Sequence, residues 1–259
     1  MMETWEYVLK KFLNEIHLRD DLVGVLVCGS YVTGNPSKHS DLDVHLILAD
    51  TVEYRERGNR RIDGLLIEYF ANPPKQIRQY FKEDYQSIDP MSHTQFATGR
   101  ILQDATGVVA KLKEEAEEML KQKYNDVTIP LSPIHAYAIW DKLDDLQDAY
   151  EIHREDFDFI FYTNLDFLLS TYMKLIKHPY NTKTICGKIT NENVRRKYLL
   201  EELPDKQVSE LIHQCITSRD QKMRLDAYQS LTKIILDLMG GFDIETFTFR
   251  SDCQMDADV

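Results

Sequence analysis

The sequence feature that most constrains the fold is a pair of apolar segments joined by a short polar stretch. Val23–Cys28 is a continuous apolar run with β-branched residues, which is typical of a buried strand, and Gly29-Ser30 follows it directly. This predicts a turn that opens a short helix. The second strand, Asp43–Leu48, begins just after Asp41. Because positions i and i+2 of a strand point to one face, both aspartates are expected to aim at one point. Two oxygen ligands beside such a turn predict a magnesium–nucleotide site.

The order Gly29-Ser30, then Asp41-x-Asp43 and an apolar residue, resembles the signature of the nucleotidyltransferase superfamily. That superfamily includes DNA polymerase beta and the antibiotic nucleotidyltransferases of the aminoglycoside and lincosamide type. The resemblance implies a Mg²⁺-dependent transfer of a nucleoside monophosphate, AMP from ATP or its equivalent from another triphosphate. It implies that Gly29 and Ser30 contact the triphosphate and that Asp41 and Asp43 hold Mg²⁺. Ser40 is expected to shape the turn before the pair and is counted with the cofactor-binding residues.

A third carboxylate is expected from a neighbouring strand. Glu68 interrupts the otherwise apolar run 65–71, and a buried, unpaired carboxylate there would be costly. It stands where the family places its third metal ligand, and we assign it to catalysis and to the metal. The family more often has aspartate at this position, although a glutamate resembles the aminoglycoside enzymes. The alternatives are a solvent-facing Glu68 and a third ligand at Asp63, which precedes the strand in a turn-like Asp-Gly.

The sequence offers few cations for the triphosphate. Many relatives carry a basic residue shortly after Gly-Ser, whereas residues 31–34 here are Tyr-Val-Thr-Gly. Asn-Pro at 35–36 stands where a P-loop has Lys-Ser or Lys-Thr, so a Walker A site is excluded. We select Lys183 of the second half as a cofactor-binding residue, with an ordinary solvated lysine as the alternative interpretation. Thr33, Lys38 and His39 are further candidates.

The chain is expected to fold as two domains. Two prolines within residues 129–133 break the pattern, and strand signals disappear beyond them. We predict an α+β fold: a nucleotidyltransferase domain with a small mixed β-sheet at 1–128, then an all-helical bundle at 129–259 that binds the substrate. The charged stretch 55–63 contains Gly-Asn and is expected to be a turn. A further strand is expected at 101–104, and helices at 3–19, 73–85, 108–124, 134–152, 156–177, 191–202, 205–218 and 221–239.

An acidic stripe marks the first helix of the second half. Asp141, Asp144, Asp145 and Asp148 are spaced i, i+3, i+4 and i+7, so they share one helix face. One interpretation is a solvated face. The other is a cleft wall that binds a cationic acceptor and supplies a general base, for which Asp144 and Asp148 are the candidates.

Charge and composition narrow the acceptor. The net charge of −12 argues against a long nucleic acid, whose binding depends on Lys and Arg, and suits a small neutral or cationic molecule such as an antibiotic. A physiological metabolite is equally permitted. The four cysteines are scattered, and the sequence has neither a long apolar run nor a basic leader. We therefore expect a cytoplasmic protein without a membrane partner. Related antibiotic enzymes can dimerise, so a homodimer is also compatible. The alternatives are an antitoxin-like enzyme that modifies a protein and a catalytically inactive nucleotide-binding module.

Overall fold

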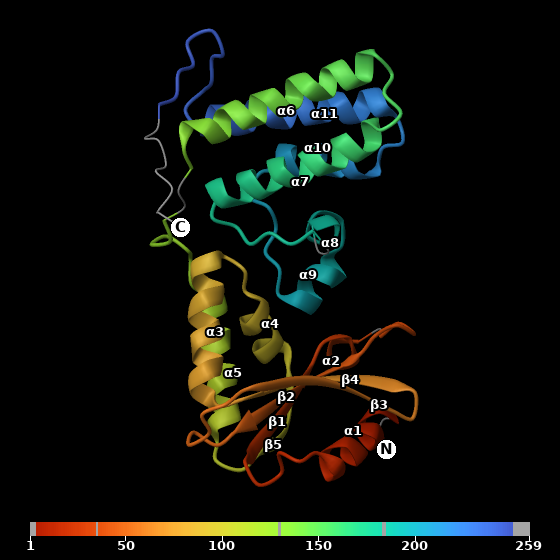
Figure 1. Cartoon of the computed structure of the whole chain (residues 1–259), viewed down its shortest axis with the longest axis vertical. Helices are drawn as coiled ribbons and strands as arrows, with labels where there is room; N and C mark the ends of the chain where they lie inside the picture. The colour runs from red at the N-terminus through yellow and green to blue at the C-terminus, as the bar shows by residue number, and fades with distance from the viewer. Residues whose placement is uncertain (1–3, 35, 129–130, 183–184, 251–259) are drawn as a thin grey trace, which may run out of the picture. The chain divides into compact units, whose positions relative to one another are not determined.

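The computed structural model describes residues 4–34, 36–128, 131–182 and 185–250. The chain divides into two compact units. The first contains Met1–Asn125 together with Asn193–Leu200, and the second contains Asp126–Glu192 with Glu201–Val259. A mixed sheet lies in the first unit and helices make up the second, so the predicted α+β class is confirmed (Figure 1).

The first unit is built around a five-stranded sheet with the order β3-β4-β2-β1-β5. Strands β2 and β4 are parallel, while the pairs β1–β2, β1–β5 and β3–β4 are antiparallel. The two central apolar strands are therefore neighbours, as their composition predicts for buried strands. The strands are β1 (Leu22–Cys28), β2 (Leu42–Leu48), β3 (Glu56–Ile62), β4 (Leu65–Asn72) and β5 (Arg100–Asp104).

Helices cover both faces of this sheet (Figure 1). Helix α1 (Thr4–Glu15) packs on one face, where Val44 and Leu46 of β2 join its core. On the other face, α3 (Pro74–Ser87), α4 (Met91–Thr98) and α5 (Val108–Leu120) pack on residues such as Leu26 and Ile47. Because side chains alternate along a strand, Asp43 belongs to the face covered by α3, α4 and α5.

The prediction of a turn within 55–63 is wrong, because Glu56–Ile62 forms β3, an edge strand of the sheet. The Gly-Asn dipeptide lies inside the strand: Gly58 pairs with Tyr69 and Asn59 with Glu68. A Cβ on Gly58 would lie 2.6 Å from the Tyr69 hydroxyl, so the glycine makes room for a tyrosine and does not form a turn. The turn instead follows the strand, at residues 63–64, where Asp63 has φ of 50°.

The second unit is a helical bundle with an aromatic core. Phe157, Phe161 and Tyr172 of α7 are buried in it with Tyr228 of α11. The bundle contains α6 (Pro133–Glu151), α7 (Phe157–Leu175), α8 (Ile185–Thr190), α10 (Lys206–Thr217) and α11 (Gln221–Leu238). Asp205 and Asp220 cap the last two helices by accepting bonds from backbone N–H groups. The helix expected over 191–202 is shorter: α9 spans Glu192–Tyr198, and all of it beyond Glu192 belongs to the first unit. Helices α4 and α8 were not predicted. No helix in the described ranges has the length and apolar character needed to cross a membrane.

Candidate metal and nucleotide site

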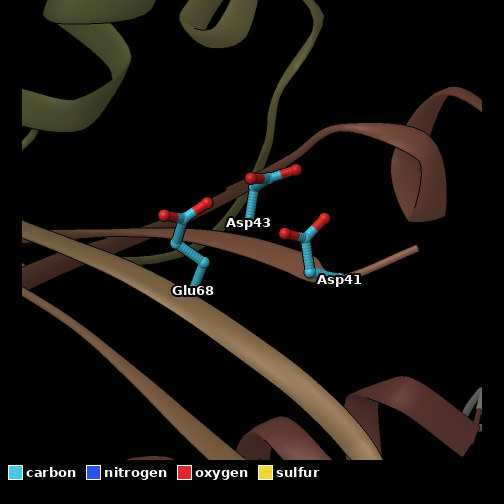
Figure 2. A group of neighbouring side chains, drawn as sticks. All are labelled: Asp41, Asp43 and Glu68. Carbon is cyan, nitrogen blue, oxygen red and sulfur yellow. The ribbon is translucent and has the colours of Figure 1, made fainter. Parts of the chain in front are cut away.

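Three carboxylates meet at the start of β2. Asp43 lies on β2 and is paired in register with Glu68 on the parallel strand β4, so both side chains leave the same face. Asp41 precedes the strand by one residue and shares that face through the two-residue repeat. One oxygen from each of the three carboxylates lies within 4.8 Å of the others. Figure 2 shows the three groups projecting from the same side of the sheet into a common space.

This crowding changes the acidity of Asp43. Its burial, followed by the charges of Asp41 and Glu68, raises the pKa of the Asp43 carboxyl from 3.8 to about 6. Neighbouring carboxylates repel one another when no cation is present, which disfavours the charged form of Asp43. The neighbouring thiol of Cys28 is affected in the same direction, because burial and the two aspartates raise its pKa. The carboxylate cluster therefore favours positive charge.

Gly29 is required where it stands for two reasons. Its φ is 74°, in the region that L side chains rarely adopt. A Cβ at this position would also lie 2.2 Å from Oδ2 of Asp43. The turn from β1 into α2 (Ser30–Thr33) thus passes directly against the carboxylate of Asp43. The Thr33 hydroxyl donates to the Gly29 carbonyl at 2.9 Å and fixes this turn.

A side-chain hydrogen bond stabilises the turn that precedes Asp41. Ser40 Oγ accepts from the backbone N–H of Ser37 at 2.8 Å, so its side chain holds the turn that precedes the aspartate pair. Lys38 and His39, two further candidates for phosphate contact, are exposed on the same turn. Lys183 lies outside the described residues.

The sequence pattern points to neither of two cations that the structure places beside Glu68 and at the end of α2. Arg57 of β3 donates to Oε1 of Glu68 through Nε at 3.1 Å and Nη2 at 2.5 Å. Lys197 of α9 donates to the backbone carbonyl of Gly34, at the end of α2, at 2.7 Å. Recognising a strand within 55–63 that pairs with β4 would have indicated Arg57, but the Gly-Asn dipeptide favours a turn there. Lys197 is distant in sequence and carries no local signal.

The alternative third ligand does not join the group. Asp63 receives a 2.6 Å ion pair from Lys11 of α1, and its side chain is half exposed. Glu68 is therefore the carboxylate that the fold brings to Asp41 and Asp43.

The acidic stripe of the second unit has a different character. Asp144, Asp145 and Asp148 are exposed on α6, and Asp141 accepts a 3.3 Å bond from Tyr137. In the part of the chain that the structure describes, the α6 aspartates form no group of the kind that could hold a metal ion. The spacing places them on one helix face without bringing their oxygens together.

The group formed by Asp41, Asp43 and Glu68 fits a hard divalent cation. All donors are carboxylate oxygens, the ligands that Mg²⁺ and Mn²⁺ prefer, and no thiolate or imidazole belongs to the group. Mg²⁺ usually takes a few carboxylates and completes its shell with water and phosphate oxygens.

The comparison with protein families agrees with this geometry. Residues 8–97 match the family model described as the nucleotidyltransferase domain. The matched range contains β1, the Gly29 turn, β2 and β4, and therefore all three carboxylates. The match supports nucleotidyl transfer as the general class of activity.

The chain was also compared with solved structures and with curated proteins. One solved structure with similarity is a nucleotidyltransferase-like protein from Exiguobacterium sibiricum 255-15, which is 12% identical with a TM-score of 0.43. The alignment covers 90% of this chain and 74% of that one. No curated protein matches the chain.

Proposed function

We propose that this protein is a magnesium-dependent nucleotidyltransferase that moves a nucleoside monophosphate from a nucleoside triphosphate, with ATP as the expected donor, onto a hydroxyl of a small molecule. The observation that carries the proposal is the meeting of Asp41, Asp43 and Glu68 within 4.8 Å beside the turn at Gly29. In the reaction, the acceptor oxygen forms a bond to the α-phosphorus. The bond from that phosphorus to the bridging oxygen breaks, and pyrophosphate leaves with its electron pair.

The chain's own residues position and neutralise the reactants. Asp41, Asp43 and Glu68 would hold the divalent cation. When bound, the cation supplies positive charge to the phosphoryl oxygens and lowers the pKa of the acceptor hydroxyl. Gly29 lets the backbone approach the triphosphate closely, and Ser30 adds a hydroxyl donor. Lys197, held at the end of α2, supplies the ammonium charge that residues 31–34 lack. Catalysis is then mostly positioning and electrostatic stabilisation.

The helical unit is the proposed acceptor-binding part. Its exposed aspartates suit a cationic or polyhydroxyl molecule, such as an aminoglycoside-like or lincosamide-like antibiotic, and the net charge of −12 disfavours a polynucleotide. Asp144 and Asp148 are the candidates for the general base that takes the hydroxyl proton, a role that contributes about 10²–10⁴-fold.

A pyrophosphate-release screen tests the proposal. ATP, GTP, CTP and UTP are each combined with Mg²⁺ and with aminoglycosides, lincosamides and hydroxylated metabolites. Asp43→Asn should reduce turnover about 10³-fold, equivalent to about 4 kcal/mol, because the remaining carboxylates no longer hold the cation fully.

Asp63→Asn is the matched control, since Asp63 is an acid of the same unit that lies outside the cluster. It should leave turnover unchanged within about twofold. Turnover that survives Asp43→Asn would contradict the metal assignment. Metal-dependent binding of ATP without pyrophosphate release for any acceptor would favour a non-catalytic nucleotide-binding module.

A further inference from the structure

We propose that Arg57 is a positioning residue for the metal site: it holds the Glu68 carboxylate where a cation can bind it together with Asp41 and Asp43. This inference rests on the proposed function, because it takes the three carboxylates to be a metal site. Arg57 lies on the edge strand β3, and neither the sequence pattern nor the family signature points to it.

The contact geometry is specific to one oxygen of Glu68. Both Nε and Nη2 of Arg57 donate to Oε1, at 3.1 Å and 2.5 Å. Arg57 therefore does not engage Oε2. A carboxylate offers about four lone-pair sites, so one held in this way keeps acceptor capacity for a cation. Charge-assisted bonds of this kind are among the stronger hydrogen bonds in proteins.

The guanidinium is itself held in place. Arg57 pairs across the strands with Phe70, so it reaches along β4 to Glu68, two residues away on the same face. The guanidinium carbon lies 4.8 Å from the centroid of the Phe70 ring. A planar cation over an aromatic face has a preferred orientation, which an ammonium does not share. The strand register and the Phe70 ring together orient the two N–H donors of the Arg57 guanidinium toward Glu68.

The cluster needs such a partner before a cation arrives. Glu68 has one more rotatable bond than either aspartate, and its side chain is 19% exposed, so solvent is within reach. Repulsion from Asp41 and Asp43 would drive its carboxylate away from the group. Arg57 opposes this movement, because arginine stays charged at any ordinary pH. The Glu68 side chain therefore loses its conformational freedom before the metal binds, and metal binding does not have to supply that entropy.

Two other roles for Arg57 predict different results. An arginine on an edge strand can serve only to prevent strand-to-strand association, in which case it has no effect on metal binding. Alternatively, Arg57 can compete with the metal for Glu68, and its removal would then tighten metal binding. Arg60 separates these cases as a matched control. It is an exposed arginine of the same strand, and it contacts the backbone carbonyl of Asn59 instead of the cluster.

The test measures metal binding directly, in the whole 259-residue chain without nucleotide or acceptor. Mn²⁺ is titrated by calorimetry and by electron paramagnetic resonance of the free ion. Arg57→Ala should weaken Mn²⁺ binding by about 10-fold or more, in the range found for groups that orient metal ligands. Arg57→Lys should lie between Arg57→Ala and wild type, because it keeps the charge and loses the fork. Arg60→Ala should stay within about twofold of wild type.

The outcomes separate this inference from the proposed function. If wild type binds Mn²⁺ and Asp43→Asn does not, while Arg57→Ala matches wild type or binds more tightly, Arg57 has no positioning role and the metal site stands. If wild type binds no Mn²⁺, the metal site fails and the role of Arg57 fails with it. Circular dichroism and thermal unfolding check each variant. Arg57→Lys retains the long side chain and keeps the comparison valid if the alanine variant unfolds.

Discussion

The two units of this protein arrange their carboxylates in opposite ways. In the first unit, residues from two parallel strands meet with their oxygens within 4.8 Å. In the second, the aspartates of α6 follow one another along a helix face, and three of them, Asp144, Asp145 and Asp148, are exposed. Both sets are equally visible in the sequence as regular spacings. A shared face is a local property, whereas convergence on one point requires a second element in a defined register.

The environments of the two sets also differ. Asp43 is partly buried beside two other carboxylates, and its pKa rises to about 6. Around the exposed α6 side chains, water weakens repulsion between like charges to about 1 kcal/mol or less at 4 Å. The first set therefore stores an unfavourable interaction that a cation can relieve, and the second set does not.

Among substitutions that leave all three carboxylates in place, the largest effect on activity should come from Gly29→Ala. The added methyl would overlap Oδ2 of Asp43, 2.2 Å away, and would displace a carboxylate of the convergent set. A displacement of about 1 Å can cost about 10²-fold in rate, so we expect pyrophosphate release to fall by about that factor.

Gly64→Ala is the matched control for this substitution. Gly64 also has a positive φ, 86°, but a Cβ there would meet nothing within 4 Å, and its turn lies outside the carboxylate cluster. Both variants should lose about 1–3 kcal/mol of stability to backbone strain. Equal losses of activity would show that the contact with Asp43 is irrelevant and that only the strained turn matters.

A smaller effect is expected from Asp43→Asn on the free energy of unfolding, measured without divalent cations. The pKa of Asp43 is about 6 in the folded protein against an ordinary value of 3.8, so the folded state binds more protons between these pH values. Stability therefore decreases as pH rises from about 4 to 6 and stays lower above that range. An asparagine side chain does not titrate, so Asp43→Asn should be more stable than wild type at pH 8, by about 1 kcal/mol after solvent screening.

Urea unfolding at pH 4 and pH 8 measures this difference, which should vanish at the lower pH. Saturating Mg²⁺ should reverse it, since wild type alone would gain the full binding energy. A metal-free Asp43→Asn variant that is less stable than wild type at pH 8 would mean that the carboxylate cluster is not under electrostatic strain.

The smallest effect belongs to the α6 stripe. Asp144→Asn removes like-charge neighbours at helical spacing and should raise stability by only about 0.2–0.5 kcal/mol. Asp145→Asn, on the same face, should behave alike. Kinetics then separate their roles: a loss of about 10²-fold in turnover for Asp144→Asn alone would identify a general base. Equal turnover in both variants, repeated for Asp148→Asn, would leave the stripe as a solvated face.

The sequence was sufficient for those parts of the site that depend on local pattern. The two central strands, the turn at Gly29 and the shared face of Asp41 and Asp43 all follow from apolar runs and two-residue alternation. Glu68 could be singled out because it interrupts an apolar run and because it stands where the resembled family places its third metal ligand. These inferences use interactions within a few residues of one another.

The remaining parts depend on pairing between distant segments. Gly-Asn usually signals a turn, and only the pairing of β3 with β4 shows that Gly58 accommodates Tyr69 inside a strand. The position of Arg57 beside Glu68 depends on the same pairing. Lys197 reaches Gly34 from more than a hundred residues away in sequence, through a helix that local spacing predicts but cannot place. Tertiary contacts, which override local propensity, determined each of these features.

The parallel pairing of β2 with β4 has a consequence for folding. A slip of two residues between them would keep every side chain on its proper face, so apolar burial alone hardly opposes it. The same slip would move Glu68 about 6.6 Å along Asp43, far beyond the reach of Mg–O bonds of about 2.1 Å. A cation therefore distinguishes the native alignment of the sheet from its nearest misalignment. Metal affinity is in this sense a readout of whether the two strands have been joined correctly.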